Sequence, residues 1–331
     1  MFNGVIRCSL ILIYCAFIAQ SQVAYSNQGL GGIKATQINI PSYDKNGRLS
    51  WELKASEVES LNGDQLLAKN PILAFYGKQK GGIARSGFGV FDLENGHAHG
   101  EDTMDITGKG LRASGNGWSF TESTEHGNHQ LSLKNDAQVQ IDDHFDVLFA
   151  GLDKPVRNTL EPTNSSSNSG EPSTNKSFPT RAHALNFELL SSEDGDYRLY
   201  FEGNVSVEMA GGAYLICEQA EIVISKERNS TASKDVQIDS IQALGSVHLL
   251  QPGRSVWADE LNWESNQSTV SLLGNARVLD DTWGEAVGET ILLEKGRGRV
   301  QVLGGEKNRS RISLPNIPNF SLPFKSTPEE P

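Results

Sequence analysis

Two histidines spaced two residues apart are the first side chains in this sequence that could do chemistry. His97 and His99 would point to one face of a strand, and Glu101 and Asp102 follow them closely. Imidazole and carboxylate groups are common ligands of zinc. The glycine-flanked, polar setting instead favours exposed residues in a turn, so we predict no metal site here.

The other reactive or ligand-binding signals stand alone. Cys217 is the single cysteine outside the N-terminal leader, and its apolar run AYLICEQAEIVI predicts a small buried side chain. The run Gly108-x-Gly110-x-x-Ala113 matches a loose dinucleotide fingerprint, but no strand-turn-helix pattern surrounds it. GxSxG, P-loop and HExxH motifs are absent. A glycosidase carboxylate pair stays open, because sequence spacing does not fix spatial separation. We predict no catalytic residue and no cofactor.

Length and charge limit the class of protein. The chain has 331 residues, enough for two domains with cores of their own, and 37% of them are hydrophobic. Its formal net charge of −12 argues against nucleic acid, because phosphate binding needs clustered Lys and Arg.

The N-terminus has the layout of an export signal. Arg7 precedes an apolar run from Cys8 to Ala19, and small-x-small sites follow at 19–21 and 24–26. This pattern predicts a secretory signal peptide over 1–26. An uncleaved N-terminal anchor is the alternative, although the apolar run is shorter than the ~20 residues that span a bilayer.

Alternating apolar residues dominate the rest of the chain and predict an all-β fold. The clearest stretch runs from Val256 to Leu303, where polar turns such as ESNQS and KGRGR separate strand-sized runs. Trp257, Leu261 and Trp263 share one parity, which predicts one apolar face. Polar turns with glycine or asparagine suit reversals between antiparallel strands. We therefore predict an antiparallel meander.

Composition divides the chain into predicted parts. We expect β domains over 30–150 and 178–305, joined by a flexible Ser/Asn/Pro-rich linker over 151–177 and followed by a Pro-rich tail over 306–331. The alternative for the linker is a long loop within one domain. The second domain repeats a glycine, a small polar residue and an apolar residue at 203–205, 245–247 and 274–276. These glycines predict tight reversals or bulges.

The order of these motifs resembles a known family. The pattern Ala258-Asp259-Glu260-Leu261, Leu273-Gly274-Asn275-Ala276, 288–292 and 298–305 is similar to the OstA-like (LptA-type) periplasmic proteins of lipopolysaccharide transport. The order D--G---W-L-A, P-L-FY and A-G-GW-F over 30–150 resembles their LptC-like relatives. The resemblance implies two twisted, V-shaped antiparallel jelly-roll troughs and a periplasmic location.

The resemblance also implies a function and its partners. Relatives receive lipopolysaccharide or a related glycolipid from an inner-membrane ABC exporter and pass it towards an outer-membrane assembly protein. Acyl chains would lie against apolar strand faces, and no enzyme activity is expected. A structural or adhesive β protein with a packed core and a secreted carbohydrate-active enzyme are the alternatives. The candidate trough-lining residues are Leu199, Phe201, Val205, Val207, Val247, Leu249, Trp257, Leu261, Trp263, Val270, Leu272, Val278, Ile291 and Leu293.

The last strand of the meander is a candidate partner edge. Arg299, Val300, Gln301 and Val302 form a strand without proline, and Gly304 and Gly305 follow it. Unpaired N–H and C=O groups at a sheet edge can add a strand from another chain. We therefore predict that this edge contacts a second copy or the outer-membrane partner.

Overall fold

The computed structural model describes much of the chain between residues 32 and 314. Gaps in the description fall at 45, 63–64, 77–79, 109, 124–127, 143–178, 192–195, 210–211, 227–235, 268, 295–298 and 306–308. The predicted signal peptide and linker, and most of the predicted tail, lie outside the described residues. The fold class is all-β, as predicted, and the strands pair antiparallel. No helix among the described residues is long and apolar enough to cross a membrane.

The described residues fall into two compact units. Unit 1 holds the residues up to 142 together with 179–205, 221–226 and 236–239, and unit 2 holds 206–209, 212–220 and 240–314. The strands that lie wholly in unit 1 are β1 (Lys34–Tyr43), β2 (Leu49–Asn62), β3 (Gln65–Lys69), β4 (Ile72–Tyr76), β5 (Lys80–Ser86), β6 (Phe88–Asp92), β7 (His97–Gly108), β8 (Leu111–Ser123), β9 (Asn128–Ile141), β10 (Thr180–Ala184) and β11 (Asn186–Ser191).

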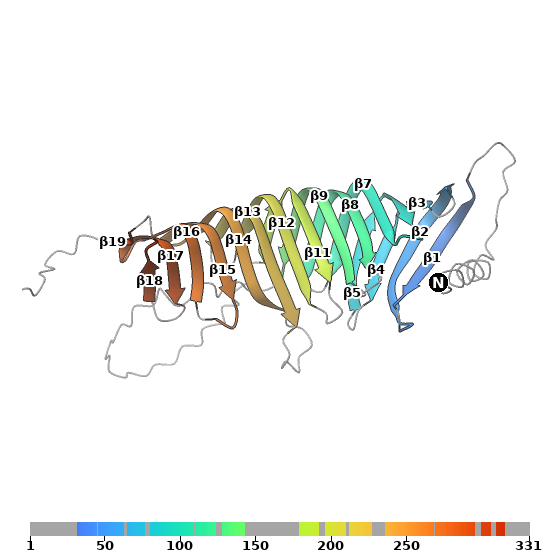
Figure 1. Ribbon diagram of the computed structural model, residues 1–331. Coiled ribbons are helices and arrows are strands. Elements are labelled where there is room, and N and C mark those ends of the chain that lie inside the picture. The colour runs from blue at the N-terminus through green and yellow to red at the C-terminus, as the bar shows by residue number, and fades with distance from the viewer. Residues whose placement is uncertain are drawn as a thin grey trace, which may run out of the picture. The chain divides into compact units, whose positions relative to one another are not determined.

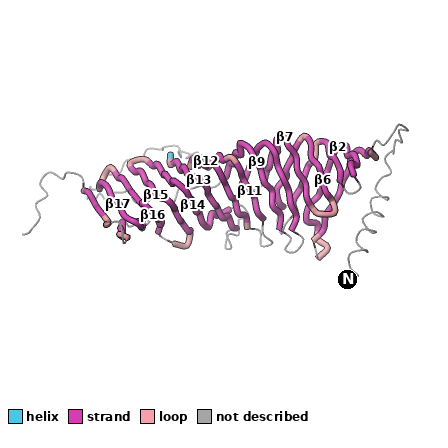
Figure 2. Tube along the Cα trace, turned by 45° about the horizontal axis from the view of Figure 1, so that its top comes forward, coloured by secondary structure: helices cyan, strands magenta, loops and turns pink. Residues whose placement is uncertain are grey.

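Three strands contribute residues to both units, and five lie wholly in unit 2. The shared strands are β12 (Tyr197–Glu208), β13 (Tyr214–Lys226) and β14 (Val236–Gln251). Unit 2 adds β15 (Arg254–Glu264), β16 (Thr269–Asp280), β17 (Gly284–Glu294), β18 (Arg299–Leu303) and β19 (Arg311–Ser313). Figure 1 labels these strands in chain order, and Figure 2 shows how little of the described chain lies in loops.

Unit 1 is a sheet in which each long strand contributes one half to each of two walls, called wall A and wall B. Wall A is formed by residues 51–54 of β2, by β4 and β5, and by residues 104–107 of β7. Wall B is formed by residues 57–62 of β2, by β3 and β6, and by residues 97–99 of β7. The strands β8 and β9 continue both walls. The apolar side chains of both walls face one interior, which includes the fully buried Trp118, Phe91 and Leu53.

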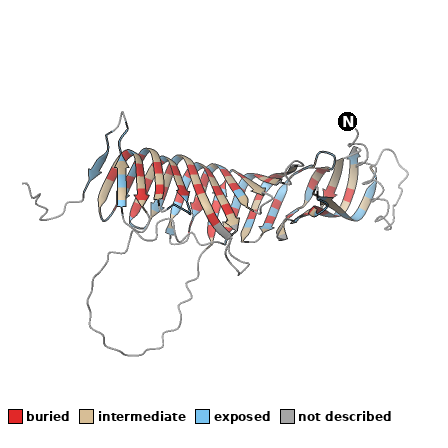
Figure 3. Cartoon of the chain, turned by 60° about the horizontal axis from the view of Figure 1, so that its bottom comes forward, coloured by how far each residue is buried: buried red, intermediate tan, exposed pale blue. Residues whose placement is uncertain are grey.

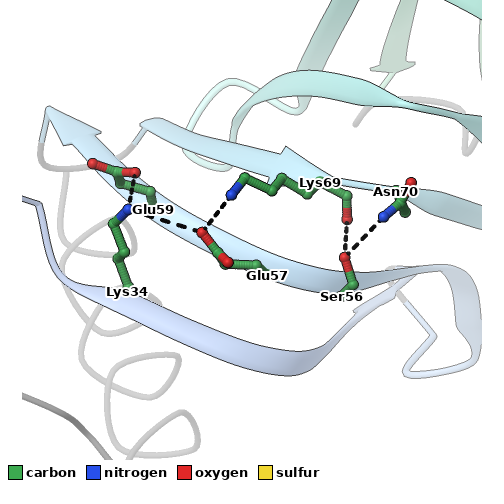
Figure 4. A network of polar contacts seen from close by, with 6 residues as sticks. All are labelled: Lys34, Ser56, Glu57, Glu59, Lys69 and Asn70. Carbon is green, nitrogen blue, oxygen red and sulfur yellow. Dashed lines mark hydrogen bonds and ion pairs between the residues drawn. The ribbon is translucent and has the colours of Figure 1, made fainter.

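An ion-pair network fixes the N-terminal strands of unit 1. Lys34 of β1 lies 3.0 Å from Glu59 of β2, and Lys69 of β3 lies 2.8 Å from Glu57 of β2 (Figure 4). Asn70 donates through Nδ2 to Ser56 Oγ at 3.1 Å, beside the same strands. These groups are partly exposed, so each pair contributes little stability and mainly fixes the alignment of the strands.

Unit 1 also contains strands that we expected in the second domain. Although β10 and β11 follow residue 178, both pair with β9, with Thr180 opposite Ile141 and Phe187 opposite Leu133. The partition into units therefore differs from the division that composition predicts. The physical reason is that β9 offers a ladder of N–H and C=O groups on the side away from β8, which β10 and β11 satisfy.

Unit 2 is the antiparallel meander that the sequence predicts. The pairs β14–β15, β15–β16, β16–β17 and β17–β18 follow chain order. β14 and β16 each bend near the middle at a bulge, where two of their residues oppose a single residue of the next strand. Gly274 and Asn275 of β16 oppose Glu289 of β17, and Gly245 and Ser246 of β14 oppose Asp259 of β15. The bulges predicted at 245–247 and 274–276 are confirmed, and they lie within strands and not at reversals.

Backbone conformation explains the residues at the bends. Gly274 and Asn275 have φ of 70° and 47°, and Gly245 and Ser246 have φ of 78° and 48°. Glycine adopts this left-handed conformation freely, and asparagine tolerates it better than most residues. The pair in β16 lets Val270 and Leu272 before the bend and Ala276 and Val278 after it turn towards one interior.

Candidate functional site

The candidate site is the apolar interior of unit 2. Its members among the predicted trough residues are between 0% and 8% exposed and come from four neighbouring strands and the end of β12. No second layer of described helix or sheet belongs to unit 2, and apolar residues on both sides of each bend are buried. Figure 3 shows the resulting alternation of buried and exposed segments along the strands. These interior residues are Val207, Val247, Leu249, Leu261, Trp263, Val270, Leu272, Val278, Ile291 and Leu293.

Three predicted trough residues belong to unit 1 instead. Leu199, Phe201 and Val205 of β12 are each 0% exposed and lie in unit 1, where Phe201 is paired with Phe187 of β11. The rings of Phe187 and Phe201 lie 5.2 Å apart, in the range of a favourable aromatic contact. Apart from Trp257, the predicted set is therefore buried but divided between the interiors of the two units.

Trp257 is the one predicted trough residue that faces away from the interior. In β15 the buried residues are Val256 and Ala258 before the bend, and Leu261 and Trp263 after it. The step from 258 to 261 changes parity, because β15 carries fewer residues through the bend than its neighbour β16. Shared parity of Trp257 with Leu261 therefore does not mean a shared face, and the prediction for Trp257 is wrong.

A row of outer-face side chains holds Trp257 across the sheet. The ring of His248 stacks on it with centroids 4.9 Å apart, and the Arg277 guanidinium carbon lies 4.8 Å from its ring centroid. Arg277 Nε donates to Glu285 at 2.7 Å, and Arg311 Nη2 donates to the other carboxylate oxygen at 3.2 Å. This row links β14 to β19 and stabilises the outside of unit 2.

A buried ion pair joins the first residue of β15 to the last residue of β16. Arg254 donates to Asp280 through Nε at 2.9 Å and through Nη2, and both side chains are 5% exposed. Asp280 also accepts the backbone N–H groups of Thr282 and Trp283. Burial alone would raise the pKa of Asp280, but these hydrogen bonds outweigh it and hold the pKa below its ordinary value.

The candidate partner edge is a half-exposed strand. Among the described residues, β18 pairs with β17 alone, with Val302 opposite Ile291 and Val300 opposite Leu293. Arg299 and Gln301 are exposed, while Val300 and Val302 are half-buried. The short strand β19 pairs with β17 further along the same side, with Ile312 opposite Ala286. An edge at β18 is consistent with the prediction, but its occupation by a partner stays a prediction.

His97 and His99 belong to no metal-binding cluster among the described residues. His97 contacts Thr121 Oγ1 through Nδ1 at 3.1 Å on an exposed strand face, and His99 is exposed. Among the described residues, no group of three or more His, Cys, Asp and Glu side chains could hold a metal ion. Cys217 is buried, as predicted, and burial raises the pKa of its thiol to about 12, which keeps it protonated.

No motif in the sequence indicates the polar cluster found in unit 1. Trp51 Nε1 donates to Glu122 at 2.7 Å, and Ser50 Oγ lies 3.1 Å from His129 Nε2. His129 lies near the start of β9 and is half-buried. The pairs are 71 and 79 residues apart in the chain, so local pattern cannot reveal them.

Comparison with known proteins gives a distant structural likeness. No protein-family model matches the chain, and no curated protein matches it. The chain is similar to the crystal structure of LptH, described as the LptA homologous periplasmic component of the conserved lipopolysaccharide transport device from Pseudomonas aeruginosa. The match covers 42% of this chain and 96% of that chain, with 16% sequence identity and a TM-score of 0.30. A score this low leaves the fold to be described from the strand pairing above.

Proposed function

We propose that this protein is a periplasmic carrier that binds the acyl chains of lipopolysaccharide or a related glycolipid in its apolar interiors. It takes lipid from an inner-membrane ABC exporter and passes it towards an outer-membrane assembly protein. The leader over 1–26 directs export, or anchors the chain if it is not cleaved. The predicted domain over 30–150 acts as the LptC-like element, and the predicted domain over 178–305 acts as the OstA-like element.

One observation carries the proposal: the bent strands of unit 2 enclose an interior lined by apolar side chains from β14 to β17. Every strand supplies apolar residues on both sides of its bend, such as Leu272 before and Val278 after the bend of β16. Burying apolar surface contributes about 25 cal/mol per Å². Several acyl chains can therefore be held without charge contacts, which suits a chain of net charge −12.

The interior is closed in the described conformation. Leu272, Val278 and Ile291 are 0% exposed, so acyl chains can enter only when the facing halves of the strands separate. A structural β protein would keep this interior packed throughout its function. A carrier opens it, and binding energy from the acyl chains offsets the lost contacts between the two halves. Capture of lipid by the interior therefore distinguishes a carrier from a structural protein.

Photo-crosslinking in cells tests the proposal. A photoreactive residue at Leu272 should form adducts with lipid, because this side chain faces the interior. The matched control is Leu279 on the same strand, which is 41% exposed on the opposite face and should form no lipid adduct. Mass spectrometry of the purified chain identifies the adducts. Adducts from Leu272 to neighbouring strands without lipid would show a packed core, and the carrier function would fail.

Photo-crosslinking also tests the β18 edge, and a separate incubation with glycolipid tests the enzymatic alternative. A photoreactive residue at Gln301, exposed on β18, should capture either a second copy or an outer-membrane protein. Capture of neither would refute strand addition at this edge. A carbohydrate-active enzyme would instead cleave sugar from the bound glycolipid, and intact glycolipid recovered after incubation with the purified protein argues against that activity.

A further inference from the structure

Unit 1 has contacts between its two walls that strand pairing does not explain. Wall A and wall B meet at the bends of the long strands, and each wall ends in a rim at the strand ends farthest from those bends. Ser50 and Trp51 lie at the rim of wall A, near the start of β2. Glu122 and His129 lie at the rim of wall B, where β8 ends and β9 begins.

Three hydrogen bonds join the two rims. Trp51 Nε1 donates to Glu122 Oε2 at 2.7 Å, and Ser42 Oγ of β1 donates to the same oxygen at 3.3 Å. Ser50 Oγ and His129 Nε2 are 3.1 Å apart. In the sheet, β2 and β8 are separated by β4, β5 and β7 along wall A. These bonds therefore exist because the sheet rolls over and brings its rims together.

Aromatic rings fill the space beside these hydrogen bonds. Trp51 meets Phe120 edge-on with centroids 5.6 Å apart, and Phe75 of wall A lies 5.6 Å from Phe120 and 5.9 Å from His129. Trp51 and Phe120 are 6% and 2% exposed. His129 Nδ1 is buried and has no hydrogen-bond partner among the described residues. A catalytic histidine is oriented by a partner at this nitrogen. The cluster therefore does not resemble a catalytic triad.

We infer that Ser42, Ser50 and Trp51 on wall A and Glu122 and His129 on wall B form a rim clasp that keeps the apolar interior of unit 1 closed. Release of the clasp separates the rims and exposes Phe120 and the interior behind it to an acyl-bearing ligand. The closing role stands on the contacts alone. The identity of the ligand rests on the proposed carrier function.

The clasp can be weakened without emptying the interior. The double variant Trp51→Phe/Ser50→Ala removes the indole N–H donor and the serine hydroxyl but keeps an aromatic ring against Phe120. The matched control is Trp118→Phe, which removes a similar indole donor, bonded to Ser86 Oγ at 3.0 Å. Trp118 is 0% exposed and pairs with Gly100 at the bend of β7, away from the rims.

Opening of the rim clasp is measured first without lipid, by the rate at which a buried thiol is labelled. Leu131 is 2% exposed and lies opposite Phe120, so Leu131→Cys places a thiol behind the clasp. In full-length chains in which Cys217→Ser removes the buried thiol, the clasp variant should react with a maleimide about tenfold faster than the Leu131→Cys chain with an intact clasp. Trp118→Phe should change that rate less than threefold at matched thermal stability. Equal rates in the two variants would overturn the clasp.

Lipid is read second, with a pyrene-labelled fatty acid as the probe. If unit 1 takes acyl chains, the clasp variant should bind the probe severalfold faster than the control. Faster thiol labelling with unchanged probe binding would establish the clasp and refute acyl entry into unit 1. Unchanged labelling with lipid still captured at Leu272 would refute the clasp and leave the proposed function of unit 2 intact.

Discussion

The bend of β16 allows a sharp test of how the interior of unit 2 is formed. Gly274 has a φ of 70°, and a Cβ added there would contact Asp259 Oδ2 and lie 2.9 Å from Asp259 Cβ and 3.0 Å from its Cγ. Gly274→Ala therefore adds backbone strain of roughly 1 to 2 kcal/mol. It also forces Asp259 away and weakens the 2.9 Å hydrogen bond from Asn275 Nδ2, worth about 1 kcal/mol. We expect a total loss of about 2 to 3 kcal/mol in the free energy of unfolding.

Three further variants separate strain from crowding. Gly253 has a φ of 77°, but the nearest atom to an added Cβ is Asp281 Oδ2 at 3.9 Å, so Gly253→Ala should cost only the strain, about 1 to 2 kcal/mol. Asp259→Gly removes the crowding atoms. The double variant Gly274→Ala/Asp259→Gly should therefore show a favourable coupling of about 1 kcal/mol in a double-mutant cycle.

Urea unfolding followed by circular dichroism measures all four chains. The result that would refute the reasoning is a Gly274→Ala chain no less stable than the Gly253→Ala chain, with no coupling to Asp259. In that case the bend would not depend on a close approach of Gly274 to β15. Another cause would then be needed to explain why residues on both sides of the bend face one interior.

Three other outcomes are expected. Trp257→Ala should lower stability but leave lipid adducts at Leu272 unchanged, because Trp257 lies on the outer face; photo-crosslinking that loses these adducts would return Trp257 to the interior. Asp280→Asn should cost roughly 3 to 5 kcal/mol in thermal unfolding at neutral pH, because Arg254 is left buried without its counter-charge; since the pKa of Asp280 is lowered, this difference should shrink as the pH falls through that pKa. Burial lowers the pKa of His129 below its ordinary 6.5, although Glu122 opposes this shift. The free energy of unfolding should therefore fall as the pH drops from about 6.5 through the lowered pKa. His129→Gln should flatten this fall, and an unchanged pH profile would mean that the imidazole is not held neutral.

The alternation of apolar residues determined the fold class. It predicted the meander from β15 to β18 and the burial of Cys217, and the glycine motifs predicted reversals or bulges, since each depends on neighbours within a few residues of the chain. Side-chain alternation follows from the pleat of a single strand, and a tolerance for positive φ is a property of glycine and asparagine themselves. These features need no knowledge of the rest of the molecule.

Tertiary structure alone decided which residues share an interior. Trp257 has the parity of Leu261, but the bend at Asp259 and Glu260 reverses the face, and that bend exists only because β16 carries an extra residue opposite it. The pairing of β10 and β11 with β9 likewise depends on which ladder is free when the sheet forms. Backbone pairing joins segments by unsatisfied N–H and C=O groups, which every residue type except proline carries alike.

The rim clasp shows the same limit most clearly. Ser50 and His129 are ordinary polar residues near turns, 79 positions apart, and neither carries a motif. They meet because the rolled sheet brings the start of β2 to the start of β9. Local sequence specifies the strands and their bends, whereas the way a twisted sheet closes on itself sets which distant side chains meet.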